Sequence, residues 1–196
     1  MDVRHDWQVE SYRPIVKAAL EVYKPEFIME LGVGYYSTSL FPDKGYIGIE
    51  SDKKWINVMF KKHPAKQFIH HDLPGLHHLT RLWELTETQK ADIYGYYQSL
   101  IIPSIPSLLF VDNYSCCRSI AINALRRKFD VVIFHDCQPE AWHVNGYDTI
   151  DPDGVQFLKT NDNWTGIIHP GDIYNAALPH INDFIKQHPQ CEMSLA

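Results

Sequence analysis

The stretch from Phe27 to Glu50 constrains the fold of this chain more than any other part of the sequence. It reads as a short apolar run, an acid, two closely spaced glycines (Gly32 and Gly34), a Ser/Thr-rich turn and a second apolar run that ends in Glu50. Glycines let the backbone turn tightly and approach a ligand where a Cβ would collide. An acid about 20 residues further on can accept hydrogen bonds from ribose hydroxyls. The pattern therefore predicts a strand–loop–helix–strand unit that binds a nucleoside cofactor.

Short apolar runs alternate with stretches of helical periodicity along the rest of the chain. The predicted strands span residues 27–29, 46–49, 65–73, 107–112, 130–136, 155–159 and 165–169. The predicted helices span residues 7–23, 51–63, most of 75–103, 115–129 and 172–187. Continuous apolar strands between helices are typical of a parallel sheet covered on both faces, and a tight turn between the last two strands favours an antiparallel edge. We therefore expect an α/β fold with a doubly wound, mostly parallel, seven-stranded Rossmann-like sheet and an antiparallel C-terminal edge.

The length of 196 residues fits a single domain over residues 1–196, with an N-terminal helical arm (1–25) and a long loop (137–154). The same sequence could also be a domain of a longer protein. A net charge of −6 argues against a nucleic-acid partner, because non-specific nucleic-acid binding needs a positive surface. No apolar run reaches the roughly 18–20 residues of a membrane span, so we expect no membrane partner. The four cysteines have neither zinc-site nor disulfide spacing, which predicts reduced thiols and a cytoplasmic location.

The glycine loop itself narrows the choice of cofactor. It lacks the third glycine of the dinucleotide fingerprint, because Tyr36 or Ser37 stands at that position. It also lacks the Gly-Lys-Ser/Thr of a phosphate-binding loop. A cofactor without phosphates is therefore favoured.

Four signals in order resemble the class I S-adenosylmethionine-dependent methyltransferases, over roughly residues 26–136. They are Glu30-x-Gly32-x-Gly34, Glu50, Asp72, and apolar strands that end in Asp112 and Asp136. The resemblance implies S-adenosyl-L-methionine as cofactor, held by Glu30, Gly32, Gly34, Ser37, Thr38, Glu50, Ser51, His71 and Asp72.

The resemblance implies a particular role for most of these cofactor-binding residues. Glu30 would orient the loop near the methionine ammonium group, and Ser37 and Thr38 could donate to the methionine carboxylate. Glu50 would bind the ribose hydroxyls, and Asp72 the adenine amino group, with His71 or Leu73 beside the ring. Asp72 and Glu50 could instead cap the helices that follow them.

The residues after the fourth and fifth predicted strands indicate the kind of acceptor. Asp112-Asn113-Tyr114-Ser115 contains no proline, unlike the Asn/Asp-Pro-Pro-Tyr motif of adenine- and glutamine-directed methyltransferases, so an oxygen acceptor is favoured. A hydroxyl acceptor needs a general base or a divalent cation that lowers its pKa. Asp112, His135 and Asp136 are the predicted catalytic residues, and Asp112 and Asp136 are candidate ligands for Mg²⁺ or another divalent cation.

This pattern resembles the metal-dependent small-molecule O-methyltransferases, and the sugar-modifying, macrocin-type enzymes more than the catechol type. His135 stands where those families have the first acid of a metal-binding pair. This difference makes His135 a candidate general base that would do the work of the bound metal. Asn113, Trp142, His143 and Tyr147 are predicted to contact the acceptor, with a stacking platform for a sugar as one interpretation and ordinary loop packing as the other.

The sequence thus predicts an O-methyltransferase whose acceptor is a small molecule with a hydroxyl group, most simply a sugar or glycan unit. Two alternatives stay open. One is a nicotinamide-dependent oxidoreductase, and the other is a non-catalytic Rossmann-like binding domain.

Overall fold

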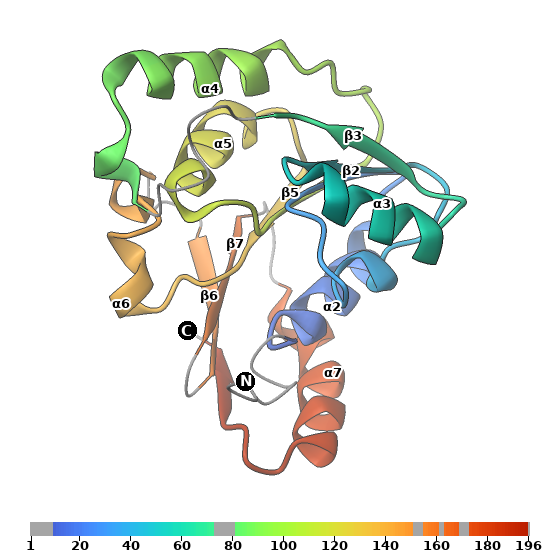
Figure 1. Cartoon of the computed structure of the whole chain (residues 1–196). Coiled ribbons are helices and arrows are strands. Elements are labelled where there is room, and N and C mark those ends of the chain that lie inside the picture. The colour runs from blue at the N-terminus through green and yellow to red at the C-terminus, as the bar shows by residue number, and fades with distance from the viewer. Residues whose placement is uncertain (1–9, 73–80, 151–154, 161–162, 169–172, 196) are drawn as a thin grey trace.

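The computed structural model describes residues 10–72, 81–150, 155–160, 163–168 and 173–195 (Figure 1). Several predicted stretches lie outside these residues. They are the first residues of the N-terminal helix (7–9), residue 73 of the third strand, 75–80 of the following helix, 151–154 of the long loop, residue 169 and residue 172.

A mixed sheet of eight strands forms the centre of the described structure. Its strands are β1 (Phe27–Leu31), β2 (Tyr46–Glu50), β3 (Gln67–His70), β4 (Ser107–Val111), β5 (Val131–Phe134), β6 (Val155–Thr160), β7 (Trp164–Ile168) and β8 (Met193–Leu195). Their order in the sheet is β3-β2-β1-β4-β5-β7-β6-β8. The first five of these strands are parallel, and β7, β6 and β8 pair in antiparallel fashion. The predicted mostly parallel sheet with an antiparallel C-terminal edge is confirmed.

The predicted number of seven strands is wrong, because β8 adds an eighth. This strand has only three residues and pairs with the outer side of β6, with Lys159 opposite Ser194. Three residues are too few to show the alternation that identifies a strand from sequence. The hydrogen bonds that β8 forms with β6, rather than the apolar pattern of its own sequence, make it a strand.

The helices and 3₁₀ turns join these strands. They are α2 (Arg13–Tyr23), η1 (Thr38–Leu40), α3 (Lys53–Lys62), η2 (Leu82–Glu84), α4 (Glu87–Ser99), η3 (Ser115–Cys117), α5 (Arg118–Leu125), α6 (Pro139–Trp142), η4 (Tyr147–Thr149) and α7 (Tyr174–Gln187). Asp52 caps α3 by accepting hydrogen bonds from the backbone N–H groups of Lys54 (2.7 Å) and Trp55 (3.2 Å).

Two predicted helices begin later than expected. Residues 82–84 form a 3₁₀ turn, and α4 begins only after Thr86, which exchanges hydrogen bonds with Gln89 in a capping box. Likewise residues 115–117 form a 3₁₀ turn before α5, which ends at Leu125. Local capping, rather than apolar periodicity, sets the start of α4.

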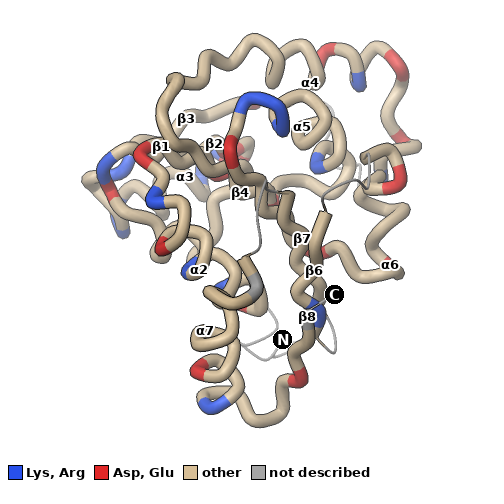
Figure 2. The backbone as a smooth tube through the Cα atoms, turned by 180° about the vertical axis from the view of Figure 1, so that it is seen from behind, with Lys and Arg blue, Asp and Glu red and all other residues tan. Residues whose placement is uncertain are grey.

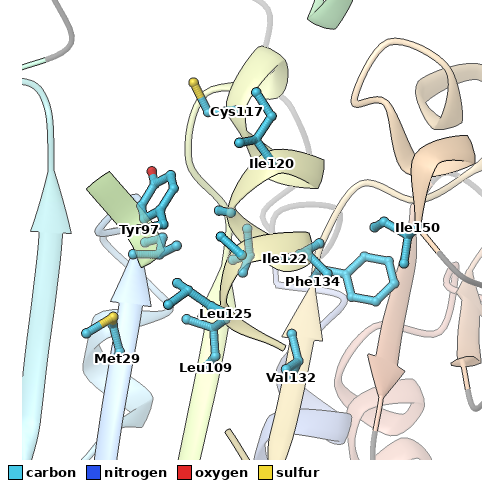
Figure 3. Packing of buried hydrophobic residues seen from close by; sticks show 14 of the residues in the cluster. Met29, Tyr97, Leu109, Cys117, Ile120, Ile122, Leu125, Val132, Phe134 and Ile150 are labelled. Atoms are coloured by element: carbon cyan, nitrogen blue, oxygen red, sulfur yellow. The ribbon is translucent and has the colours of Figure 1, made fainter. Parts of the chain in front are cut away.

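The central strands are buried on both faces, which is why they read as continuous apolar runs. Side chains alternate along each strand, so that Phe110 and Ile133 face α2 and α7, whereas Leu109 and Val132 face α5. Figure 3 shows the second of these two layers, in which Leu125 of α5 packs over the strand residues. Figure 1 shows α2 and α7 side by side on one side of the sheet and α5 on the other.

All four cysteines are free and buried, in agreement with the prediction of reduced thiols. Within the described residues, none of the helices has the length and apolar character needed to cross a membrane.

Candidate functional site

A cavity of about 330 Å³ lies at the carboxyl ends of β1, β2 and β4. This is the edge of an open α/β sheet at which ligands are expected to bind. The predicted site residues at its wall are Gly32, Gly34, Glu50, Ser51, His71, Asp112 and Asn113. The fold therefore brings together residues from four separate stretches of the chain, as the sequence pattern predicted.

The backbone at Gly32 packs tightly against the residues that follow β4. Its φ is +79°, in the left-handed region, and its N–H donates to the carbonyl of Ile49 at 2.9 Å. A Cβ at this position would lie 2.4 Å from the carbonyl oxygen of Asp112 and 2.5 Å from the Cα of Asn113. Only glycine lets the loop after β1 pass this close to the residues after β4.

The carboxylate of Glu30, at the end of β1, hydrogen-bonds to the loop that contains Gly34, Ser37 and Thr38. Glu30 is fully buried, and its carboxylate accepts hydrogen bonds from Ser37 (2.5 Å), Thr38 (2.7 Å), the hydroxyl of Tyr46, and the N–H of Gly34 (3.4 Å). Burial raises the pKa of Glu30 to about 7, although the hydroxyl donors lower it.

The contacts of Ser37 and Thr38 differ from the roles predicted for them, whereas Glu30 contacts the loop that it was predicted to orient. The two hydroxyls donate to Glu30, and none of the three is among the described residues that line the cavity. They shape the loop rather than present themselves to a ligand. The carboxylate and its donors fold together because a buried charge needs several hydrogen bonds.

Glu50 is presented to the cavity in a fixed orientation. One carboxylate oxygen, Oε1, accepts hydrogen bonds from the N–H of Ser51 (2.7 Å), the hydroxyl of Ser51 (3.2 Å) and the N–H of Asp52 (2.9 Å). No described residue donates a hydrogen bond to the other oxygen, Oε2. The residue that caps the following helix α3 is Asp52 and not Glu50.

His71 and Asp72 behave differently from each other. His71 lines the cavity and its ring stacks on Tyr96 of α4, with ring centroids 3.3 Å apart and an angle of 4° between the planes. Burial lowers the pKa of His71, which favours the neutral ring. Asp72 is exposed and is not among the described residues at the cavity wall, so the structure does not place it where the predicted adenine contact requires.

Asp112, His135 and Asp136 lie together at the ends of β4 and β5, as predicted. Nδ1 of His135 is 3.7 Å from Oδ1 of Asp112 and 3.5 Å from Oδ1 of Asp136. His135 is 4% exposed, and its Nε2 lies 3.1 Å from the hydroxyl of Ser11. Burial lowers the pKa of His135, but the carboxylates of Asp136 and Asp112 outweigh it and raise the pKa above its ordinary value. Of the three, only Asp112 lines the cavity.

Arg118, the first residue of α5, lines the cavity but was not predicted as a site residue, and neither were Tyr97, Tyr114 and Ser115 at the same wall. The guanidinium of Arg118 donates to Oδ1 of Asp112 and Oδ2 of Asp136, both at 2.8 Å. It also donates to the backbone carbonyls of Asn113 (2.8 Å) and His135 (3.0 Å). A signal was present in hindsight, because a cation is unfavourable at the N-terminus of a helix and so needs anionic partners.

The predicted metal site has to be judged with Arg118 in place. Asp112, His135 and Asp136 each present one ligand atom, all within 4.8 Å of one another, which is a geometry able to hold a cation. However, the guanidinium already binds one oxygen of each carboxylate. A divalent cation would have to share both acids with an arginine that is 7% exposed. The carboxylates of Asp112 and Asp136 therefore fit the guanidinium of Arg118 better than they fit a bound metal ion.

The predicted acceptor platform is mostly internal packing. Tyr147 is fully buried, and its hydroxyl donates to the carbonyl of His135 at 2.7 Å. Trp142 packs against Tyr147 and Phe157, with ring centroids 5.4 Å and 5.8 Å away. His143 is exposed, and its Nδ1 lies 3.5 Å from Oδ2 of Asp148. None of the three predicted platform residues is among the described residues at the cavity wall, so the loop-packing interpretation is the one that the contacts support.

Asn113, the fourth residue predicted to contact the acceptor, lines the cavity, and its side-chain amide donates to the hydroxyl of Tyr97 at 2.9 Å. A scan against models of known protein families finds no match to the chain, and a search of curated protein sequences finds none either. The fold and the site together define an α/β protein with a cavity at the carboxyl edge of its sheet.

Proposed function

We propose that this chain is an S-adenosylmethionine-dependent methyltransferase that transfers a methyl group to a hydroxyl of a small acceptor by in-line displacement. A sugar or glycan unit is the acceptor that the sequence resemblance implies.

One observation carries the proposal. The cavity joins the glycine turn at Gly32, the carboxylate of Glu50 and the carboxylate of Asp112, which come from the ends of three strands. Its volume of about 330 Å³ lies in the usual range for small-molecule sites. In this arrangement the turn would accommodate the methionine part of the cofactor, Glu50 the ribose, and His71, stacked on Tyr96, the base.

The same loop argues against a nicotinamide dinucleotide. A pyrophosphate is usually bound at the N-terminus of a helix that follows the glycine turn. Here the turn leads into η1, a 3₁₀ turn of three residues, so no long helix points its N-terminus into the cavity from this loop. A cofactor without phosphates suits this geometry.

Asp112 is the group best placed to serve the acceptor. Bound S-adenosylmethionine would supply an electrophilic methyl group, and the protein has to position the hydroxyl and remove its proton. Asp112 is partly exposed at the cavity wall, with the imidazole of buried His135 3.7 Å behind it. Asp112 can therefore accept the proton of the hydroxyl, while His135 and Arg118 hold the carboxylate of Asp112 in place.

Calorimetric titration with S-adenosylmethionine tests the proposal. We expect the wild-type protein to bind the cofactor and the variant Glu50→Gln to bind it about 10- to 100-fold more weakly, because hydrogen bonds from the ribose to a carboxylate are lost. Glu87→Gln is the matched control, since Glu87 is an exposed acid on α4 whose partner is Lys90. This control should bind the cofactor as the wild type does.

The contrary outcomes are distinct. Binding of a reduced nicotinamide dinucleotide in place of S-adenosylmethionine would favour the oxidoreductase. Binding of neither cofactor at about millimolar concentration would contradict the proposal and favour a non-catalytic binding domain.

A further inference from the structure

We propose that Arg118 is the permanent cation of the site at the ends of β4 and β5, where it occupies the position between Asp112 and Asp136 that a divalent metal would otherwise fill. The site then needs no metal ion, and removal of Arg118 should create a metal site. The inference concerns the acceptor side of the proposed active site, but its test requires neither cofactor nor acceptor.

The guanidinium of Arg118 is surrounded by four oxygen acceptors from two strand ends, as a bound metal ion would be. Nη2 bonds Asp112 and Nη1 bonds Asp136, each at 2.8 Å, and the remaining contacts go to two backbone carbonyls. All of these acceptors belong to the residues that directly follow β4 and β5. The guanidinium thus ties the two strand ends together, which is the structural service that a bridging metal gives.

The position of Arg118 along its helix supports the same conclusion. Figure 2 shows a basic segment, residues 126–128, beyond the C-terminal end of α5, where cations are favoured by the helix dipole. Arg118 lies at the opposite end of this helix, where the dipole disfavours a cation. Burial adds a further penalty, since only 8% of its side chain is exposed. The two carboxylates are the groups that offset both costs.

Charge balance explains why a metal should not bind beside it. One guanidinium opposite two carboxylates leaves a single negative charge in the group, and a divalent cation would reverse that sign in a partly buried place. Without the guanidinium, two carboxylates and the imidazole of His135 would remain, with ligand atoms within 4.8 Å of one another. Carboxylates with one imidazole suit Mn²⁺ well.

The test measures Mn²⁺ binding by electron paramagnetic resonance, in which free Mn²⁺ gives a strong signal that protein-bound Mn²⁺ lacks. We expect Arg118→Met to bind Mn²⁺ at least about tenfold more tightly than the wild type. The double variant Arg118→Met/Asp136→Asn should lose this gain, because it lacks one of the ligands.

Lys66→Met is the matched control. Lys66 is also a buried cation with a carboxylate partner, Asp43 at 3.1 Å, but it has no second acid among the described residues, so its removal should create no Mn²⁺ site. Arg118→Gln serves as a second variant that keeps two N–H donors for the acids. If Arg118→Met is unfolded alone, Mn²⁺ should restore its far-ultraviolet circular dichroism.

Two results would overturn the proposal. The first is that the wild-type protein binds Mn²⁺ as tightly as Arg118→Met does, and that the single substitution Asp136→Asn in the wild type abolishes this binding. The second is that neither Arg118→Met nor Arg118→Gln gains Mn²⁺ binding, with or without restoration of the fold. A failure of S-adenosylmethionine to bind would leave both readouts unchanged, so the two proposals fail separately.

Discussion

Gly32→Ala should abolish ligand binding in the cavity and lower the free energy of unfolding by about 2–5 kcal/mol. Two independent causes act at this position. A non-glycine residue at a φ of +79° costs about 1–2 kcal/mol, and the new Cβ would meet the carbonyl oxygen of Asp112 at 2.4 Å. All three atoms in conflict with it, this oxygen and the N and Cα of Asn113, belong to the backbone, so none can turn aside as a side chain could.

Urea denaturation and calorimetric titration with S-adenosylmethionine measure the two effects of Gly32→Ala. Gly95→Ala is the control, because a Cβ at Gly95 in α4 would have no neighbour within 4 Å. That substitution should stabilise the protein by about 0.5–1 kcal/mol, since alanine is the better helix former. A Gly32→Ala protein as stable as the wild type, with unchanged cofactor affinity, would show that the loop does not pack on the residues after β4.

The strands that carry the site were predictable because their local sequence and their environment agree. β1, β4 and β5 are buried on both faces, so each is a largely apolar run that needs no knowledge of its neighbours. The acids and glycines that end these strands then share one edge, because parallel strands all end there. This is why Gly32, Glu50 and Asp112 could be grouped from the sequence alone.

The features that sequence reasoning missed depend on contacts between distant residues. Arg118 reads as an ordinary helix residue, and only its two acids, one of them 18 positions away, give it a role. Tyr147 reads as a ligand platform until its hydroxyl is seen to donate to the carbonyl of His135. Hydroxyl side chains in a glycine loop suggest a ligand, but Ser37 and Thr38 serve the buried carboxylate of Glu30. Pairing of polar groups inside a protein is decided by the fold, not by spacing along the chain.

The cavity therefore depends on two buried charged side chains: Arg118, which lines it, and Glu30, which is not among the described residues at its wall. Arg118 fixes the acids at the ends of β4 and β5, and Glu30 fixes the loop after β1. Both charges are costly to bury, and each is held by several hydrogen bonds. The residues that would meet a ligand are positioned by the residues that support them.

Glu30→Gln should become more stable than the wild type as the pH rises, by about 3 kcal/mol above pH 7. The pKa of Glu30 is raised from an ordinary value of 4.5 to about 7 in the folded protein, first of all by burial. A raised pKa means that the folded state binds the proton more tightly than the unfolded state does. The stability contributed by this proton is fully present below pH 4.5 and is lost as the pH rises through 7.

Urea denaturation at about pH 5 and about pH 8 measures this difference, because glutamine mimics the protonated carboxyl group and does not titrate. The two proteins should have similar stability at the lower pH and diverge at the higher one. Glu87→Gln, which removes an exposed acid from α4, should follow the wild type at both values. Equal pH dependence in Glu30→Gln and the wild type would mean that Glu30 folds with its charge at no cost. In that case the hydrogen bonds from Ser37, Thr38 and Tyr46 would balance its burial in full.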